Sequence, residues 1–444
     1  MPGRHSRRTV LAALTALPAA GALGACSGPS AASAHSPGRG RTTITFWSAL
    51  RGSQQVVDEY NKTHDRIHVV YEQVPSGAQG GDAKLNNAAR AGNAPDIATT
   101  DYSTLPSFAI DGVTRDVTSL MSEGFRRRLL PQALALTTFA DRSFGVPVDI
   151  EPMVLHYRKD LFDHYGIHVP STWDEYEDTA SAVRRAAPDR RLGPFWSDGW
   201  AQFIACAWQA GARWYGIHGD TWNISMADGP TRKVAAYWQR LIDTGLVFMN
   251  PGSGRQSDAQ IAEGLVLTRL NGAWDAGAQM TAHPSQKGQW RIAALPQWDL
   301  THPYTGTQGG STYMITKDSR NPEAAMEFVE WLVGSPAALR ARLASGASSQ
   351  YPAVPDLMPV ARSGFDRSYY GGQDIYRLFD AEAQKIRQGW IWGPRMSPTT
   401  SVLTDGFARV SAGRGTLIDA VRAAQSGTMP DLRAIGLSTT QHSG

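Results

Sequence analysis

Cysteine is scarce in this sequence: only Cys26 and Cys206 occur among 444 residues, so the chain is not a disulfide-stapled scaffold. Cys206 lies in the apolar run 203–208, a setting typical of a buried structural thiol. The eleven histidines are scattered, without the paired spacing on one helix face that indicates a metal site. A glycine-rich loop ending in Gly-Lys-Ser or Gly-Lys-Thr, which would cradle nucleotide phosphates, is absent. We therefore expect no metal and no cofactor.

Net charge is also low. The formal charge is +3 at pH 7, but Arg4, Arg7 and Arg8 belong to a leader that has no acidic residue before Cys26. Without this leader the chain is close to neutral, which removes the electrostatic basis for binding nucleic acid. After the leader, no segment of the sequence is apolar enough to cross a membrane.

Residues 1–25 have the features of an export signal. A basic start precedes a run of apolar and small residues from Val10 to Ala25, which is shorter than the ~20 apolar residues of a membrane-spanning helix. The run ends in Leu23-Gly24-Ala25-Cys26, which resembles the lipobox of bacterial lipoproteins and implies that Cys26 receives a lipid. Alternatively, Cys26 is only a small residue near an ordinary secretory cleavage site. The Arg7-Arg8 pair resembles a twin-arginine signal, although a basic leader can contain such a pair by chance.

The rest of the chain divides into a tether and a folded part. Residues 26–41 contain no apolar residue larger than alanine after Cys26, so we expect a flexible tether. The roughly 400 residues that follow exceed a single ordinary core, which favours two lobes. Alternating strand and helix patterns indicate parallel strands with helices on the sheet faces. The expected strands are 43–47, 67–71, 96–99, 145–148 and 154–157, and the expected helices are 53–61, 82–91, 173–185 and 324–333.

Several short motifs occur in the order found in one protein family. They are Ile44-Thr45-Phe46-Trp47-Ser48, Ala94-Pro95-Asp96-Ile97, Phe144-Gly145-Val146-Pro147, His156-Tyr157-Arg158-Lys159-Asp160-Leu161-Phe162, Pro170-Ser171-Thr172-Trp173-Asp174-Glu175, Glu263-Gly264 with Gly272-Ala273-Trp274, and Gly309-Gly310-Ser311 with Asn321-Pro322-Glu323-Ala324-Ala325. Together they resemble the family 1 extracellular solute-binding proteins, the group of maltose-binding protein, from Thr43 to about Gln425. The family usually has Tyr-Tyr-Asn-Lys-Asp at residues 156–160, a difference that lies on the scaffold.

The resemblance implies an α/β fold of two lobes, each a mixed or parallel sheet flanked by helices, joined by a three-segment hinge. The lobes would comprise residues 42–149 with 310–345, and 150–309 with 346–444. The implied function is that of a lipid-anchored receptor on the outer face of the cell membrane. This receptor, which we expect to be a monomer, binds a sugar and delivers it to an ABC permease served by a separate ATPase subunit. The alternatives are a receptor for a polyol, a glycerol phosphate or a peptide, and a secreted glycoside hydrolase.

A sugar site needs aromatic planes for the CH-rich ring faces and polar groups for the hydroxyl rim. Trp47 ends the first expected strand and is a candidate plane, with a core aromatic as the alternative. Trp200 and Trp274 match stacking positions of the family, and Trp392 lies in a C-terminal loop. We favour Trp274, because small residues precede it and the run 265–270 reads as a strand that ends near the cleft.

The polar candidates follow strand ends and the first hinge crossing. Ser48 follows Trp47, and Asp101 is a rim acceptor or, alternatively, a turn or cap residue. Asp149 and Glu151 are two residues apart, so in an extended segment both side chains face the cleft. Glu151 matches the position of a cleft carboxylate in the family.

Three further candidates come from the second half of the chain. Gly309 and Gly310 would bring backbone close to the ligand, or would serve as hinge glycines. Arg395 would donate to a hydroxyl pair, or would cap a helix or pair with a surface acid.

Overall fold

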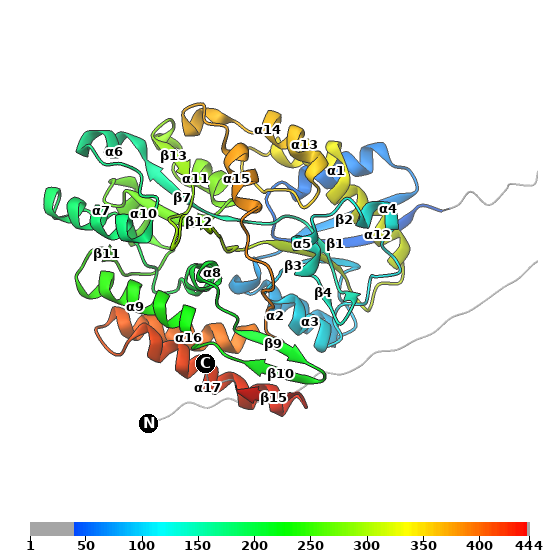
Figure 1. Cartoon of the computed structure of the whole chain (residues 1–444). Helices are drawn as coiled ribbons and strands as arrows, with labels where there is room; N and C mark the ends of the chain where they lie inside the picture. The colour runs from blue at the N-terminus through cyan, green and yellow to red at the C-terminus, as the bar shows by residue number, and fades with distance from the viewer. Residues whose placement is uncertain (1–39, 442–444) are drawn as a thin grey trace, which may run out of the picture. The chain divides into compact units, whose positions relative to one another are not determined.

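The first strands of the chain form a five-stranded sheet in the computed structural model, which describes residues 40–441 (Figure 1). In this sheet β1 (Thr42–Ser48) pairs in parallel with β2 (Ile67–Gln73) and β3 (Ile97–Asp101). β14 (Ser311–Ile315) runs antiparallel between β3 and β6 (Val146–Pro147). A segment from the second half of the chain therefore completes a sheet begun by the first half.

Aromatic packing joins helices to this sheet. Phe46 of β1 is fully buried and contacts Phe328 of α12 (Pro322–Gly334), with ring centroids 5.7 Å apart. Tyr60 of α1 (Ser53–Thr63) contacts the same Phe328 ring edge-on at 4.8 Å. The neighbouring elements are α2 (Gly81–Arg90), α3 (Leu105–Ile110), α4 (Glu123–Arg126), α5 (Pro131–Ala135), β4 (Thr138–Phe139), β5 (Arg142–Ser143) and α13 (Pro336–Leu343).

A second sheet is antiparallel, with the order β12–β7–β13. Its strands are β7 (Met153–Arg158), β12 (Thr268–Gly272) and β13 (Trp290–Ala293). Nearby, α7 (Trp173–Ala186) begins at Thr172, whose hydroxyl accepts from the Glu175 amide at 3.1 Å in a capping box. This start satisfies amides that the first helical turn leaves unpaired.

Shorter strands and further helices surround the second sheet (Figure 1). β8 (Gly193–Pro194) pairs with β11 (Val247–Phe248), and β10 (Thr221–Ile224) lies between β9 (Tyr215–His218) and β15 (Ser438–Gln441). The helices are α6 (Lys159–Tyr165), α8 (Trp200–Ala210), α9 (Gly229–Asp243), α10 (Arg255–Ala262), α11 (Asp275–Ala282), α14 (Met358–Gly364), α15 (Ile375–Ala383), α16 (Met396–Ser411) and α17 (Leu417–Ala434).

Three backbone segments run side by side between the two main sheets. The Val148 amide donates to the Ser311 carbonyl at 2.9 Å, and the Ile150 amide donates to the Tyr351 carbonyl at 3.0 Å. The first crossing segment contains Val148 and Ile150 and leads from β6 into β7, and the second leads into β14 at Ser311. The third contains Tyr351 and lies between α13 and α14. These hydrogen bonds tie the crossings into one narrow connection.

The structure confirms the expected α/β fold and its main elements. The strand expected at 265–270 is displaced, because β12 begins only at Thr268 and Val266 instead forms a bridge with Arg191. Cys206 is fully buried in α8, and burial raises the pKa of its thiol to about 12, which confirms the structural role. The predicted leader, Cys26 and the tether up to residue 39 lie outside the described residues.

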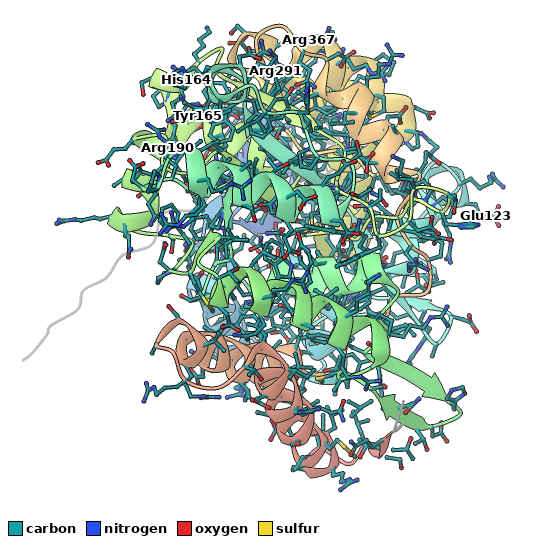
Figure 2. All side chains as sticks on the ribbon, turned by 60° about the vertical axis from the view of Figure 1, so that its left-hand side comes forward. Glu123, His164, Tyr165, Arg190, Arg291 and Arg367 are labelled. Carbon is teal, nitrogen blue, oxygen red and sulfur yellow. The ribbon has the colours of Figure 1, made fainter. Side chains whose placement is uncertain are left out.

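The surface of the described part is polar. Figure 2 shows Glu123 at its periphery, with its side chain directed away from the ribbon. None of the helices between residues 40 and 441 combines the length and apolar character needed to span a bilayer.

Candidate functional site

A cavity of about 640 Å³ lies where the crossing segments meet the ends of β1, β2 and β3. Its volume is within the range typical of small-ligand sites. The carboxyl ends of parallel strands are the usual place for ligands in α/β sheets, because the loops that follow them are free to vary. It is lined by residues from the loops after β1 and β2, from the crossing segments, from α8 and from the turn between β12 and α11.

Four tryptophans line this cavity, as the sequence predicted: Trp47, Trp200, Trp274 and Trp392. Trp274 is partly exposed and lies between β12 and α11, and its Nε1 donates to the Gln308 carbonyl at 3.0 Å. A Cβ atom on Gly272 or Gly309 would lie 2.9 Å from the indole ring. The two glycines therefore let the pyrrole edge of the ring come close to the backbone.

The other indoles differ in how much surface they offer. The Lys84 ammonium lies 4.2 Å from the centre of the Trp47 ring and so covers part of one face. Trp200 is the first residue of α8 and is partly exposed. Trp392 is only 6% exposed and packs edge-on against Trp390, so it presents mainly an edge.

Asp149 and Glu151 both reach the cavity from the first crossing segment. Asp149 accepts a hydrogen bond from the Ser311 amide at 2.7 Å, and burial raises its pKa to about 7. Glu151 is 1% exposed, and neither carboxylate oxygen has a hydrogen-bond partner within the described part of the chain. Burial, and then the charge of Asp149, raise the Glu151 pKa well above its ordinary value. Backbone groups of Trp274 and Tyr351 lower this pKa less, without forming hydrogen bonds of good geometry.

Asp101 and Asp82 line the cavity at the ends of β3 and the start of α2. The Asp101 side chain is exposed toward the cavity, yet the surrounding protein and then the nearby Asp82 carboxyl raise its pKa to about 7. Enclosure also raises the Asp82 pKa, while the Thr104 hydroxyl, 3.3 Å away, opposes the shift. Only Asp101 of this pair was a candidate from the sequence.

Two arginines line the cavity that the sequence did not single out. The Arg51 Nε donates to the Ala347 carbonyl at 2.7 Å. Arg342 is 3% exposed and donates to the Tyr313 hydroxyl at 2.6 Å and to the Arg51 carbonyl at 3.2 Å. Their places depend on contacts across nearly 300 residues of sequence, which no local pattern reveals.

Three further residues with unpartnered polar atoms line the cavity, and none of them was a candidate from the sequence. Thr100 Oγ1, Thr307 Oγ1 and Gln308 Oε1 are buried atoms without a hydrogen-bond partner among residues 40–441. Buried polar atoms normally have partners, and a ligand in the cavity would supply hydrogen bonds to these atoms and to the Glu151 carboxyl.

The structure does not bring Ser48 and Arg395 into the cavity lining. Ser48 is fully buried, and its hydroxyl bonds the Thr99 hydroxyl at 2.8 Å and the Leu50 amide at 3.1 Å, so it organises the turn after β1. Arg395 instead forms an ion pair with Asp111 at 2.5 Å, the alternative foreseen from the sequence.

Gly309 and Gly310 do line the cavity, with φ of 88° and 105°. A Cβ atom on Gly310 would lie 2.6 Å from the Tyr102 ring. Both positions therefore require glycine for backbone conformation and for close packing.

Two main sheets, connected by three backbone segments around a ligand-sized cavity, define a binding protein for a small solute. The chain belongs to the bacterial extracellular solute-binding protein family, whose model matches residues 48–339. Among the described residues, no group of three His, Cys, Asp or Glu side chains could hold a metal ion.

Named relatives and solved structures agree with this family. A maltooligosaccharide ABC transporter solute-binding lipoprotein of Streptococcus pneumoniae is 27% identical over 64% of this chain and 66% of its own. An arabinooligosaccharide-binding protein of Bacillus subtilis is 24% identical over 67% of this chain and 70% of its own. The chain thus spans about two thirds of the length of these relatives. The galacto-N-biose-/lacto-N-biose I-binding protein of an ABC transporter from Bifidobacterium longum, in complex with lacto-N-biose, superposes with a TM-score of 0.80 at 26% identity, covering 90% of this chain and 99% of that one. The fold is therefore that of the periplasmic-binding-protein-like proteins.

Proposed function

We propose that the protein is the extracytoplasmic receptor of an ABC importer and binds a mono- or oligosaccharide in this cavity. The observation that carries the proposal is the convergence of four indoles with buried, unpartnered polar atoms. Glu151 and Gln308 present oxygens without a hydrogen-bond partner among the described residues, which ligand groups that both donate and accept would satisfy. A sugar meets both requirements, because its ring faces stack on indoles and its hydroxyls donate. The oligosaccharides named for the relatives support the same class.

The binding mode that we propose is closure of two lobes on the ligand. Residues 42–149 with 310–345 would form one lobe, and 150–309 with 346–444 the other, hinged at the three crossing segments. Cys26 would carry the lipid that holds the receptor, as a monomer, at the outer face of the membrane. A permease and a separate ATPase subunit would take up the released sugar.

Two rival functions fit the site less well. A glycoside hydrolase needs one carboxylate that stays ionised beside one acid, about 5–10 Å apart. Here burial raises the pKa of both Asp149 and Glu151, and Asp149 already accepts a hydrogen bond from the Ser311 amide at 2.7 Å. A phosphorylated ligand would need free cationic donors, whereas Arg51 and Arg342 already donate to protein oxygens and four carboxyls face the same cavity.

Titration calorimetry with neutral mono-, di- and oligosaccharides tests the proposal, with polyols, glycerol phosphate and short peptides as competitors. We expect saturable 1:1 binding of at least one sugar, without hydrolysis products after long incubation. Glu151→Ala should weaken this binding more than tenfold, because it removes both carboxyl oxygens from the cavity. The control Glu123→Ala, on the exposed periphery, should not change it (Figure 2). Binding of a polyol or a peptide in place of every sugar would refute the proposal, and sugar breakdown would favour the hydrolase.

A further inference from the structure

The end of the cavity formed by the loops after β2 and β3 has an unusual pair of carboxyls. Asp101 ends β3 and begins a turn in which the Thr104 amide donates to the Asp101 carbonyl at 3.0 Å. The Asp82 carboxyl accepts from the Thr104 hydroxyl of the same turn at 3.3 Å. Two acidic side chains therefore meet at one turn, and both face the cavity.

The positive charges of the cavity lie elsewhere. The Arg342 guanidinium lowers the pKa of Asp149, and the Arg51 guanidinium lowers that of Glu151, so both arginines act on the other two carboxyls of the cavity. Neither Asp82 nor Asp101 forms an ion pair with any described residue. The surplus negative charge of the cavity is thus located at this pair.

The nearest lysine does not neutralise the pair. Lys84 is two residues after Asp82 on α2, but its ammonium pairs with Glu72 and lies over the Trp47 ring. The absence of a cation is consistent with the raised pKa of both carboxyls. Closing the cleft on a neutral ligand would leave these two carboxyls without a compensating cation, so at least one of them would have to take up a proton. A cationic ligand group would instead stabilise their ionised forms.

Two independent features also indicate that a ligand group belongs here. Thr100, next to Asp101, is 4% exposed, and its hydroxyl lines the cavity without a hydrogen-bond partner in the described chain. Trp47, which packs with Leu85 one turn after Asp82, adds an aromatic surface that attracts cations. A carboxyl pair beside an indole and a free hydroxyl is suited to a protonated amine, which donates in several directions.

We propose that the ligand is a sugar carrying a protonated amine and that Asp82 and Asp101 bind this ammonium group. This inference depends on the proposed sugar-binding function and narrows its substrate class to cationic amino sugars. The ammonium compensates the two carboxylates, whereas a hydroxyl in its place supplies a donor but no charge.

The test compares amino sugars with hydroxyl counterparts of the same skeleton by calorimetry at neutral pH. The pairs are glucosamine with glucose, galactosamine with galactose, mannosamine with mannose, and the free-amine dimer of β-1,4-linked glucosamine with cellobiose. The N-acetylated forms remove the charge and keep the bulk. We expect at least one amine to bind about ten- to a hundredfold tighter than both of its partners, the range of a charge-assisted hydrogen bond.

Variants of Asp82 and Asp101 test whether the preference for the amine depends on these two carboxyls. Asp101→Asn and Asp82→Asn keep the side-chain shape, and each should reduce the preference for the amine to less than about threefold, while Glu123→Gln should leave it unchanged. Melting curves of the ligand-free variants verify folding, and Asp101 is exposed enough that its variant should fold normally. The inference is overturned if hydroxyl sugars bind as well as their amines, or if the preference survives in both variants. In those cases the sugar-binding function stands. Failure of every sugar, charged or neutral, to bind counts against that function as well.

Discussion

Replacing Trp274 by alanine is the most direct test of the cavity as a sugar site. The indole is partly exposed, its pyrrole edge packs against Gly272 and Gly309, and its Nε1 donates to the Gln308 carbonyl at 3.0 Å. Loss of a stacking plane of this kind costs about 1–3 kcal/mol of binding free energy, by analogy with bases stacked on aromatic side chains. We therefore expect Trp274→Ala to raise the Kd for the best sugar of the panel about 5- to 150-fold by calorimetry. Trp274→Phe should recover most of the affinity, since it keeps a plane on the same glycines.

The control must separate binding from stability. Trp222 on β10 is also partly exposed but does not line the cavity, so Trp222→Ala should lower the melting temperature without changing the affinity. The opposite result for Trp274→Ala, a lower melting temperature of the ligand-free protein with the wild-type Kd, would refute the reasoning. Trp274 would then be a packing residue, and the case for the cavity would lose its best aromatic plane.

Three further predictions address anchoring, closure and ionisation. Cys26→Ala should release the protein into the medium or leave it as uncleaved precursor, and wild-type membrane retention on a fractionation blot would contradict lipid anchoring at this residue. Small-angle scattering should show a smaller radius of gyration when the sugar is bound. Arg395→Ala should speed sugar release about two- to fivefold, because it removes the partly exposed ion pair with Asp111 that joins α16 to the end of α3. The double variant Arg395→Asp with Asp111→Arg should restore the release rate, and identical release rates in all variants would exclude this role. Because the folded pKa of Asp149 is raised to about 7, its contribution to stability is complete below its ordinary pKa near 4 and is lost as the pH rises to about 7. In Asp149→Asn the amide oxygen still accepts from the Ser311 amide, but the side chain no longer titrates. The free energy of unfolding of the ligand-free variant should therefore fall less between about pH 4 and pH 7, by on the order of 2 kcal/mol. An unchanged pH profile would show that Asp149 does not titrate in this range.

Local sequence patterns were sufficient for most elements of the fold. The alternation of Ile44 and Phe46 predicted β1, and Thr172 with Glu175 predicted the start of α7. The same alternation argues against Ser48 as a ligand contact. Ser48 lies on the buried face of the strand with Ile44 and Phe46, whereas Trp47 lies on the opposite face. Pairing Trp47 with Ser48 as site residues overlooked this period of two.

Tertiary contacts decided the rest of the site. Arg395 lies in a loop that suggests a ligand donor, but folding places it beside Asp111, 284 residues earlier in the chain. Arg51, Arg342 and Asp82 carry no motif. Arg51 and Arg342 meet because the loop after β1 packs against α13, and Asp82, at the start of α2, meets the turn after β3 at Thr104.

The sequence by itself determined the family, the strand and helix order, and the residues at strand ends, because these depend on periodicity and on short motifs that are local in the chain. The charge balance of the cavity, on which the proposed preference for an amino sugar rests, was decided only by the tertiary structure. Each carboxyl acquires or lacks a compensating cation according to which distant segments the fold brings within a few ångströms, and Coulomb energy depends on that distance and on burial rather than on position in the sequence.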